Sequence, residues 1–466
     1  MKLNKLMFRE YDIRGIWNED ITEEVSYYIG RAYATKLLSL KKNKMIVGYD
    51  NRLSSPIIEK NLVKGLTDGG VDVVRLGLVT TPMYYYAWDK LNIHCGIMIT
   101  ASHNPKEYNG FKMSYNGIHN CFGNEVAELY YIILNGIYSK GNGSITDANI
   151  KEDYIKMINS HINMGSNKLK VIYDCGNGTT SIVAKDIFVS NDNIEYIPLF
   201  AESDGTFPNH HPDPAVESNL TILKEKVKEL NADCGIAFDG DGDRVGVVNE
   251  KGEFVSIDKF MVIIWRDIYN KIDKKEGFYD VKCSKVVSDE MIKLGLKPVE
   301  VRTGNSYTKK ISVDNNYPFG GELSGHLYFR DKFIGTDDGI YAGLRLVEIL
   351  SHNPKKVSKL LEGITKYYNY PEGKFTVEDS KKDIIVSRVE EYCKEKGYNY
   401  SKIDGIKVLY DDGFALVRKS NTGPNITTRY ESSDKEKLEL IKQEFDSLII
   451  KYSKEKNRIN MNKRIE

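Results

Sequence analysis

A pattern of strand, turn, helix and strand occurs three times along this chain of 466 residues. Short apolar runs open the three copies at 44–50, 169–174 and 278–282, and each is followed by a helical pattern and a second apolar run. Strands that alternate with helices form βαβ units with parallel pairing. A chain of this length also needs more than one hydrophobic core. We therefore expect three related α/β domains.

A polar loop follows a buried-type strand in each copy. The strands at 94–99 and 233–238 both contain Cys-Gly-Ile, and they lead into Thr-Ala-Ser-His-Asn-Pro and Asp-Gly-Asp-Gly-Asp-Arg. In the third copy, the run 317–321 leads into Glu-Leu-Ser-Gly-His. Sheets of this kind bind ligands at the loops that follow their parallel strands. Three such loops predict one shared cleft.

Beyond about Tyr368 the pattern changes to two strand-like runs, a polar loop and a helix over 434–452. We expect a smaller domain here. The predicted fold class is α/β, with three related mixed α/β domains plus a smaller C-terminal α+β domain around a central cleft. We place the four domains at 1–152, 153–253, 254–368 and 369–466.

Composition argues against several classes of protein. Lys and Arg together number 66, as do Asp and Glu, whereas a protein that coats nucleic acid carries a basic excess. No run approaches the roughly 20 apolar residues that span a bilayer, and the N-terminus lacks a signal-peptide pattern. The six cysteines form no Cys-x-x-Cys pair, which disfavours a disulfide framework or a zinc site. We expect a cytoplasmic monomer or homodimer with no nucleic-acid or membrane partner.

Three aspartates in the second loop predict a metal site. Asp239, Asp241 and Asp243 alternate with glycines, so their carboxylates point the same way around one small ion. Three hard oxygen ligands suit Mg²⁺, and without a cation these carboxylates would repel one another. An Asp-Gly surface turn explains single pairs but not this run after a buried strand. An EF-hand fits the position of Glu250, but the apolar run 245–248 argues against it.

Ser102 is the candidate nucleophile of the first loop. Pro105 prevents a helix there, and Lys112 follows ten residues after Ser102. A Ser beside a His is not by itself a catalytic pair, because adjacent residues on an extended chain point apart, and alone the sequence is typical of a turn. A hydroxyl that attacks phosphorus needs its proton removed and the developing charge neutralised. A metal ion and Lys112 would meet the second need.

The third loop offers hydrogen-bond partners for a sugar. Glu322, Ser324 and His326 alternate around Gly325. A carboxylate and a hydroxyl that face one way can bind two neighbouring sugar hydroxyls. A turn whose Glu and His are solvated explains the sequence equally well by itself. The place of this loop in the series favours a ligand.

Two arginines are candidates for anion binding. Arg244 directly follows the aspartates and offers a fork for an anion. Arg418 begins the loop Arg-Lys-Ser-Asn-Thr-Gly-Pro, whose hydroxyls and amide form an anion nest, with a basic surface turn as the alternative. The sequence Phe-Arg-Glu-Tyr-Asp-Ile-Arg-Gly at 8–15 carries no prediction by itself, because Tyr11 fits a core position and Arg14 fits a surface position.

Taken in order, these motifs resemble the α-D-phosphohexomutase superfamily, and most closely its bacterial phosphomannomutase/phosphoglucomutase branch. The resemblance covers nearly the whole chain, and it includes Asn-Gly-Phe-Lys at 109–112. It implies that Ser102 carries the phosphoryl group and that Asp239, Asp241 and Asp243 hold Mg²⁺, with the phosphoserine supplying another oxygen.

The resemblance also implies roles for the other loops. Glu322 and Ser324 would bind the 3- and 4-hydroxyls of the sugar. Arg14, Lys112 and His326 would flank the transferring group, for charge stabilisation and proton transfer. The phosphate that does not react would be held by Arg418, Ser420, Asn421 and Thr422. Further substrate-binding candidates are Tyr11, Arg244, Lys282 and Asn305.

The implied reaction interconverts hexose 1-phosphate and hexose 6-phosphate through a bound hexose 1,6-bisphosphate that turns end for end. Glucose 1,6-bisphosphate would recharge dephosphorylated enzyme. Asn305 departs from this branch, which often has His there, and Asn cannot exchange a proton near neutral pH. Leu323 replaces the polar residue of the phosphoglucosamine branch, which favours glucose and mannose phosphates.

Two kinds of alternative stay open. The first is another enzyme on the same scaffold, either a phosphoglucosamine mutase or a hexose-bisphosphate synthase. The second is a non-catalytic sugar-phosphate sensor, for which Asn305 is the one hint, since Ser102 and the three aspartates are present. Turnover on each hexose 1-phosphate separates these hypotheses.

Overall fold

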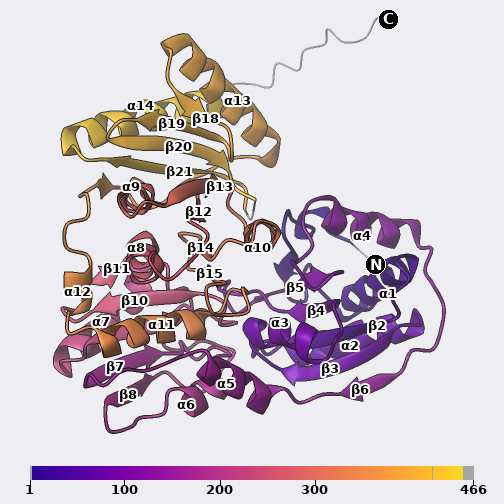
Figure 1. Cartoon of the computed structure of the whole chain (residues 1–466). Coiled ribbons are helices and arrows are strands. Elements are labelled where there is room, and N and C mark those ends of the chain that lie inside the picture. The colour runs from indigo at the N-terminus through magenta and orange to yellow at the C-terminus, as the bar shows by residue number, and fades with distance from the viewer. Residues whose placement is uncertain (1–2, 422, 455–466) are drawn as a thin grey trace, which may run out of the picture. The chain divides into compact units, whose positions relative to one another are not determined.

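The computed structural model describes residues 3–421 and 423–454, and the chain forms two compact units (Figure 1). The first unit runs to Tyr279 and also contains Met291–Val299 and Gly304–Gly363. The second unit contains Asp280–Glu290, Glu300–Thr303 and the described residues from Ile364 onwards. The chain therefore passes into the second unit and returns twice before its C-terminal part begins.

The first sheet has six strands in the order β1-β5-β4-β2-β3-β6. Their bounds are β1 Ile13–Ile16, β2 Lys44–Tyr49, β3 Asp72–Leu78, β4 Gly96–Ile99, β5 Tyr108–Ser114 and β6 Ile145–Asp147. The accompanying helices are η1 Lys5–Met7, α1 Glu23–Ser39, α2 Ser55–Asp68, α3 Thr81–Lys90 and α4 Asn124–Asn135. β2 is parallel to β3 and β4. β4 is buried along its whole length, as expected for a parallel strand covered on both faces.

The second sheet has five strands in the order β11-β10-β9-β7-β8. Their bounds are β7 Leu169–Asp174, β8 Ile194–Leu199, β9 Cys234–Phe238, β10 Val245–Asn249 and β11 Phe254–Val255. The helices of this part are α5 Lys151–Ser160, α6 Ser181–Ile187, η2 Glu217–Leu220 and α7 Thr221–Glu229. β7 is parallel to both β8 and β9.

The third sheet has four strands in the order β13-β12-β14-β15. Their bounds are β12 Glu276–Asp280, β13 Lys297–Val301, β14 Phe319–Gly321 and β15 Leu327–Phe329. The helices of this part are α8 Ile257–Ile268, α9 Lys285–Lys293, α10 Asn305–Asp314, α11 Gly339–His352 and α12 Val357–Leu360.

The three sheets share a hairpin that carries a polar loop. β4 and β5, β9 and β10, and β14 and β15 are antiparallel pairs. The first strand of each hairpin is also parallel to another strand of its sheet. The three loops contain Ser102, Asp239 and Glu322 in turn. The prediction of three related mixed α/β domains is therefore confirmed, and the polar loops lie at equivalent positions.

The sheet of the second unit is antiparallel, in the order β16-β21-β20-β19-β18, with β17 also paired to β21. Its strands are β16 Tyr368–Asn369, β17 Gly373–Thr376, β18 Tyr400–Ser401, β19 Ile406–Tyr410, β20 Gly413–Lys419 and β21 Asn425–Ser432. Two helices, α13 Asp379–Lys396 and α14 Lys435–Lys454, share a core with the sheet that includes Val389, Phe445 and Val408. The predicted C-terminal α+β domain is confirmed.

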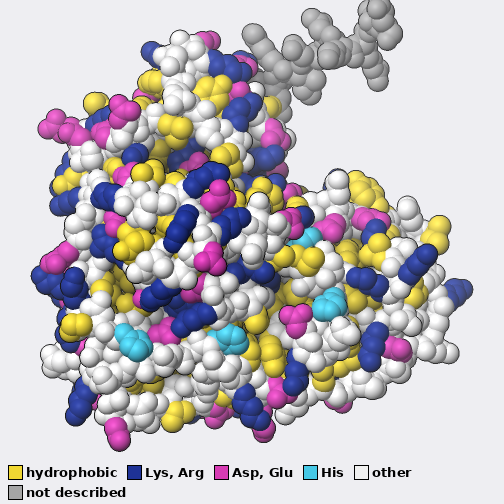
Figure 2. All heavy atoms as spheres, viewed as in Figure 1, with side chains coloured by type: hydrophobic (Ala, Val, Ile, Leu, Met, Phe, Trp, Pro, Cys, Tyr) yellow, Lys and Arg dark blue, Asp and Glu magenta, His cyan; other side chains and the backbone are white. Residues whose placement is uncertain are grey.

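Charged side chains are mixed on the surface. On the face shown in Figure 2, Lys and Arg lie interspersed with Asp and Glu. Among residues 3–421 and 423–454, no helix is both long enough and apolar enough to cross a bilayer.

Candidate active site

Ser102 lies in the loop between β4 and β5 in an unusual backbone conformation. Its φ angle is 51°, in the left-handed region that residues with a Cβ rarely occupy. Its side chain is buried, and its Oγ donates to Asp239 Oδ2 at 2.9 Å. Strained backbone of this kind is concentrated at functional sites. Two loops that are far apart in the sequence therefore meet at this hydroxyl.

His103 contacts the same hydroxyl. The Ser102 Oγ lies 3.2 Å from His103 Nδ1. The prediction that these neighbours point apart is wrong, because it assumed an extended chain, and the left-handed φ of Ser102 turns its side chain toward the imidazole. Burial, followed by the nearby charge of Arg244, lowers the pKa of His103 well below its usual value. His103 is therefore a neutral imidazole beside the candidate nucleophile.

Arg52 holds the loop that contains Ser102. Its guanidinium is buried and donates to four backbone carbonyls, those of Ser102 (2.7 Å), Asn104 (2.7 Å), Pro105 (2.6 Å) and Tyr108 (3.0 Å). Its Nε donates to an Asp50 oxygen at 3.1 Å, so all five N–H groups of the side chain are used. These hydrogen bonds from the rigid guanidinium fix the conformation of the Ser102 loop.

The loop between β9 and β10 brings together the carboxylates of Asp239, Asp241 and Asp243. All three residues are fully buried, and their ligand oxygens lie within 4.8 Å of one another. The backbone N–H of Thr81, at the start of α3, donates to the Asp241 carbonyl at 2.9 Å, and its hydroxyl donates to Asp241 Oδ2 at 2.6 Å. The positive end of a helix favours a negative group at this position.

The three aspartates fit a divalent cation. Asp241 Oδ1 and Asp243 Oδ1 are buried and accept no hydrogen bond within the described part of the chain. Burial, together with the charges of Asp241 and Asp243, raises the pKa of Asp239 well above its usual value. Three hard oxygen donors that carry excess negative charge suit a small divalent metal ion.

Lys112 on β5 contacts two of these carboxylates. Its Nζ donates to Asp241 Oδ2 at 2.7 Å and to Asp243 Oδ2 at 2.5 Å. Burial alone would lower the pKa of Lys112, but the two carboxylates raise it above its usual value. Lys112 is therefore a buried cation at the metal site.

Arg14 on β1 faces the Ser102 loop. Its guanidinium donates to the Asn104 side chain at 2.9 Å and forms an ion pair with Asp12. Its Nε is buried and has no hydrogen-bond partner among the residues that the structure describes. This unused donor is available to an anion beside Ser102.

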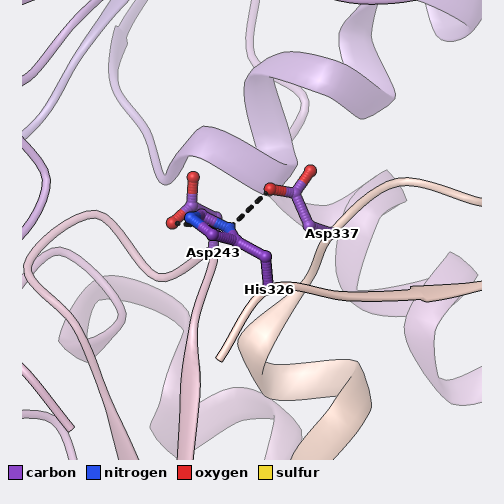
Figure 3. Close-up of side chains that lie close together, drawn as sticks. All are labelled: Asp243, His326 and Asp337. Carbon is purple, nitrogen blue, oxygen red and sulfur yellow. Dashed lines mark ion pairs between the residues drawn. The ribbon is translucent and has the colours of Figure 1, made fainter. Parts of the chain in front are cut away.

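The third loop brings His326 to the aspartates. Arg244 Nε donates to His326 Nε2 at 3.0 Å and lies 3.7 Å from Asp239 Oδ2. The His326 imidazole lies between the carboxylates of Asp243 and Asp337 (Figure 3), with its Nδ1 3.6 Å from Asp243 Oδ1 and 2.9 Å from Asp337 Oδ2. Asn305 Nδ2 lies 3.1 Å from the same Nδ1.

The predicted sugar-binding pair is at the edge of this cluster. Glu322 is buried and accepts a hydrogen bond of 2.5 Å from the Gly304 backbone, whereas Ser324 is half-buried. The ring of Tyr11 packs on Gly304, where a Cβ would lie 2.2 Å from Tyr11 Cζ. Gly304 has a φ of 138°, so a larger residue fits neither the backbone nor the ring.

The second unit carries the predicted phosphate loop. Arg418, at the end of β20, donates from Nε to Asp404 Oδ2 at 3.0 Å. Ser420 is buried, its hydroxyl accepts a hydrogen bond from Gly423 N at 3.1 Å, and Asn421 is half-buried. Thr422, also predicted here, lies outside the described residues. In the same unit, Lys282 forms an ion pair of 3.1 Å with Glu372.

Four family models match this chain in order. They describe phosphoglucomutase/phosphomannomutase alpha/beta/alpha domains I, II and III and the C-terminal domain, and they match residues 5–135, 152–252, 256–368 and 372–448. The chain belongs to the phosphoglucomutase/phosphomannomutase family. It is therefore an intramolecular phosphotransferase, as its resemblance to the phosphohexomutases implied.

Relatives in this family match along nearly their whole length. The chain is 40% identical over 440 residues to a phosphomannomutase/phosphoglucomutase of Pseudomonas syringae, covering 94% of both proteins. It is 34% identical to a phosphoglucomutase of Neisseria gonorrhoeae, with 95% of this chain and 96% of the relative covered. A crystal structure of a family protein from Burkholderia thailandensis superposes with a TM-score of 0.89 at 33% identity, covering 98% of this chain and 99% of that one.

Several residues of this phosphoglucomutase/phosphomannomutase site were not predicted from its sequence. They are Arg52, His103, Lys309, Asp337 and Asp404. Asp337 and Asp404 lie in loops outside every motif. Asp337 pairs with Lys309, and Asp404 accepts from the Thr303 backbone 101 residues away. Arg52 follows the strand-ending Asp50 by two residues, which was the one usable signal.

Proposed function

We propose that this hexose-phosphate mutase moves a phosphoryl group between O1 and O6 of glucose and mannose phosphates by way of a phosphoserine at Ser102. One observation carries the proposal, namely the 2.9 Å hydrogen bond from the Ser102 hydroxyl to Asp239, within the buried aspartate trio that Lys112 also contacts. The names of the Pseudomonas and Neisseria relatives support glucose and mannose as the sugars. Leu323 in the sugar loop disfavours glucosamine phosphate.

We infer that Asp239, Asp241 and Asp243 hold Mg²⁺, and that the ion, when bound, neutralises charge on the transferring phosphoryl group. Lys112, at the aspartates, and Arg14, at the Ser102 loop, would add positive charge near the transferring group. Phosphoryl transfer depends mainly on such positioning and charge stabilisation.

The proposed transfer has two halves. In the first, a hydroxyl of the bound sugar phosphate attacks phosphorus, the bond from phosphorus to Ser102 Oγ breaks, and the hydroxyl proton ends on the Ser102 oxygen. Lys112 and His326 would assist this step through charge and position. The sugar 1,6-bisphosphate then turns end for end. In the second half, its other phosphoryl group passes to Ser102, and the new sugar hydroxyl regains a proton.

The remaining predicted residues would hold the sugar phosphate. Glu322 and Ser324 would bind sugar hydroxyls, and Tyr11, Arg244, Lys282 and Asn305 would support binding. The non-reacting phosphate would be held by Arg418, Ser420 and Asn421, with Thr422 outside the described residues. This loop must accept either end of the bisphosphate, so it would recognise an anion and not a particular carbon. Glucose 1,6-bisphosphate would recharge the enzyme, and composition favours a cytoplasmic location.

The test compares turnover of glucose, mannose and glucosamine 1-phosphates in coupled assays with Mg²⁺ and glucose 1,6-bisphosphate. We expect conversion of the first two and a loss of at least about 1,000-fold in kcat for Ser102→Ala. The control Ser39→Ala, at the exposed end of α1, should keep full activity. Preferred conversion of glucosamine phosphate, accumulation of bisphosphate, or binding without turnover would each point to one of the alternatives.

A further inference from the structure

A buried chain of polar side chains runs from α10 to the aspartate trio. Lys309 on α10 contacts Asp337, Asp337 contacts His326, and His326 contacts Arg244. Lys309, Asp337 and His326 are exposed by 3% or less. Lys309 and Asp337 are not among the three aspartates of the metal site, and they belong to none of the sequence motifs.

The donors and acceptors fix the protonation of the imidazole. Arginine Nε is only a donor, so the Nε2 of His326, 3.0 Å away, must accept with its lone pair. The proton of a neutral ring is then on Nδ1, which lies 2.9 Å from Asp337 Oδ2. Which nitrogen of a histidine carries the proton is set by the partner of the other nitrogen. Asp337 and Arg244 therefore select the same tautomer from opposite sides.

Asp337 is itself held from two directions. Asn305 Nδ2 donates to Asp337 Oδ2, and Lys309 Nζ lies 3.4 Å from Asp337 Oδ1. Burial alone would raise the pKa of Asp337, but Lys309 and the hydrogen bond from His326 lower it to about 2. The carboxylate is therefore an anion that can accept from both donors. Asn305, the departure from the family pattern, supports this carboxylate as a second donor.

Lys309 is anchored on a different helix. Its ammonium lies 2.8 Å from the ring centroid of Tyr85 and 5.2 Å from that of Trp88, both on α3. A cation over an aromatic face is attracted by the ring quadrupole, most strongly when both groups are desolvated. α3 is also the helix that begins at Thr81, the partner of Asp241. Lys309 thus links Asp337 to the helix that supports the metal loop.

Asp243, His326 and Asp337 could be mistaken for a second metal site (Figure 3). Both imidazole nitrogens are already engaged, one by Asp337 and the other by Arg244. Lys309 also places positive charge beside Asp337. A second cation at this cluster would face repulsion from Lys309. The cluster fits a positioning network better than a metal site.

We propose that Asp337 and Lys309 are positioning residues that keep His326 in its Nδ1–H tautomer, so that the Nε2 lone pair holds the Arg244 guanidinium beside Asp239 and Ser102. This inference rests on the proposed function, because it assigns the network to phosphoryl transfer at Ser102. The backbone N–H of Arg244 also donates to Asp239 Oδ1 at 3.1 Å. A change in the tautomer of His326 would therefore also disturb the Asp239 carboxylate, which accepts the hydrogen bond from Ser102.

The direct test is the tautomer of His326 in the full-length, ¹⁵N-labelled enzyme with Mg²⁺. Long-range ¹H–¹⁵N spectra distinguish protonated from unprotonated ring nitrogens, and His326→Gln assigns the signal among the eight histidines. We expect the Nδ1–H form in the parent enzyme and a larger share of the Nε2–H form in Asp337→Asn, where Arg244 still selects the tautomer but Asp337 no longer does. An Nε2–H ring in the parent, or an unchanged spectrum in Asp337→Asn, would overturn the proposal. Neither readout needs turnover, so a failure of the proposed function would be seen separately.

Kinetics test the consequence. In Asp337→Asn, kcat should fall about 10- to 100-fold, as is typical for loss of an orienting partner of histidine, with KM changed less than about threefold. Asp338→Asn is the matched control, because Asp338 is an equally buried neighbour that bonds Tyr154 and not His326. It should keep both the tautomer and kcat. A loss of kcat equal to that of Asp337→Asn in this control would contradict the proposal.

A second variant keeps the test usable if Asp337→Asn fails to fold. Lys309→Met removes the charge but keeps most of the side-chain volume, and kcat should fall about 3- to 10-fold. The control is Lys310→Met, the next residue on α10, whose ammonium is 40% exposed and pairs with Asp314. It should match the parent enzyme. Equal activity of the two methionine variants would overturn the role of Lys309.

Discussion

The backbone of Gly240 passes close to the carbonyl oxygen of Ser102, and a Cβ on Gly240 would lie 2.5 Å from that oxygen. The loop with the candidate nucleophile and the loop with the three aspartates therefore touch through their backbones. The backbone N–H and the hydroxyl of Thr179 both donate to the Gly240 carbonyl at 2.9 Å, so the backbone at Gly240 is held in place. The glycine sets the distance between hydroxyl and carboxylate.

Gly240→Ala should separate Ser102 from Asp239. The methyl group must displace a loop that Arg52 holds in place, and a misplacement of about 1 Å can cost about 100-fold in rate. We expect kcat to fall by about that factor in the coupled assay. Gly295→Ala is the control, because Gly295 has a φ of 75° but no atom within 4 Å of its added Cβ. It should lose stability but not activity, whereas full activity of Gly240→Ala would contradict the close-contact account.

Arg52→Met should destabilise the protein and the Ser102 loop. It removes five side-chain hydrogen bonds, four to backbone carbonyls and one to Asp50 Oδ2, and breaking a buried pair of this kind costs about 3–5 kcal/mol in the free energy of unfolding. Urea denaturation measures this loss. Arg75→Met, which breaks an exposed ion pair with Asp147, should cost less than about 1 kcal/mol. Equal losses in the two variants would show that Arg52 does not organise the loop.

Asp404→Asn should weaken substrate binding more than turnover. Asp404 Oδ2 accepts from Arg418 Nε and from the Thr303 backbone, so it fixes the plane of the guanidinium that is proposed to bind the non-reacting phosphate. We expect KM to rise about tenfold with kcat nearly unchanged, the sign of a lost binding contact. Asp383→Asn removes only an exposed pair with Lys419 and should leave KM unaltered. A fall in kcat alone would argue against this role.

Asp338 should make stability depend on pH. Burial raises the pKa of Asp338 to about 7, although hydrogen bonds from Tyr341 and Tyr154 oppose the shift. Between about pH 4 and 7 the folded protein retains a proton that the unfolded chain releases. The contribution of this group to the free energy of unfolding therefore falls as pH rises through that range and levels off above about pH 7.

Asp338→Asn removes this dependence. Its free energy of unfolding should match that of the parent protein near pH 4 and exceed it by a few kcal/mol near pH 8, as measured by urea denaturation at both values. Asp186→Asn, which alters a half-exposed pair with Lys151, should not change with pH in this way. A variant that is less stable than the parent at pH 8 would mean that the folded protein stabilises the charged carboxylate of Asp338, so that its pKa is not raised.

The sequence predicted the parts of the site that are local. Asp239, Asp241 and Asp243 are close because they are neighbours on one short loop, and Ser102 and Lys112 flank one hairpin. The left-handed backbone of Ser102 was not predictable, because serine rarely adopts it and glycine was absent. The roles of Asp337 and Lys309 depend on the packing of α10 near α3, and no local sequence pattern predicts that packing. Helix α13 was not predicted either, because too few of its residues are apolar to show a helical pattern.

The most direct test of the account is the intact mass of the enzyme after incubation with glucose 1,6-bisphosphate and Mg²⁺, followed by peptide mapping. The account predicts one added phosphoryl group, located on Ser102, that is lost on incubation with hexose 1-phosphate and never appears in Ser102→Ala. A phosphoryl group on another residue, or turnover at the full rate without any phosphorylated enzyme, would contradict it.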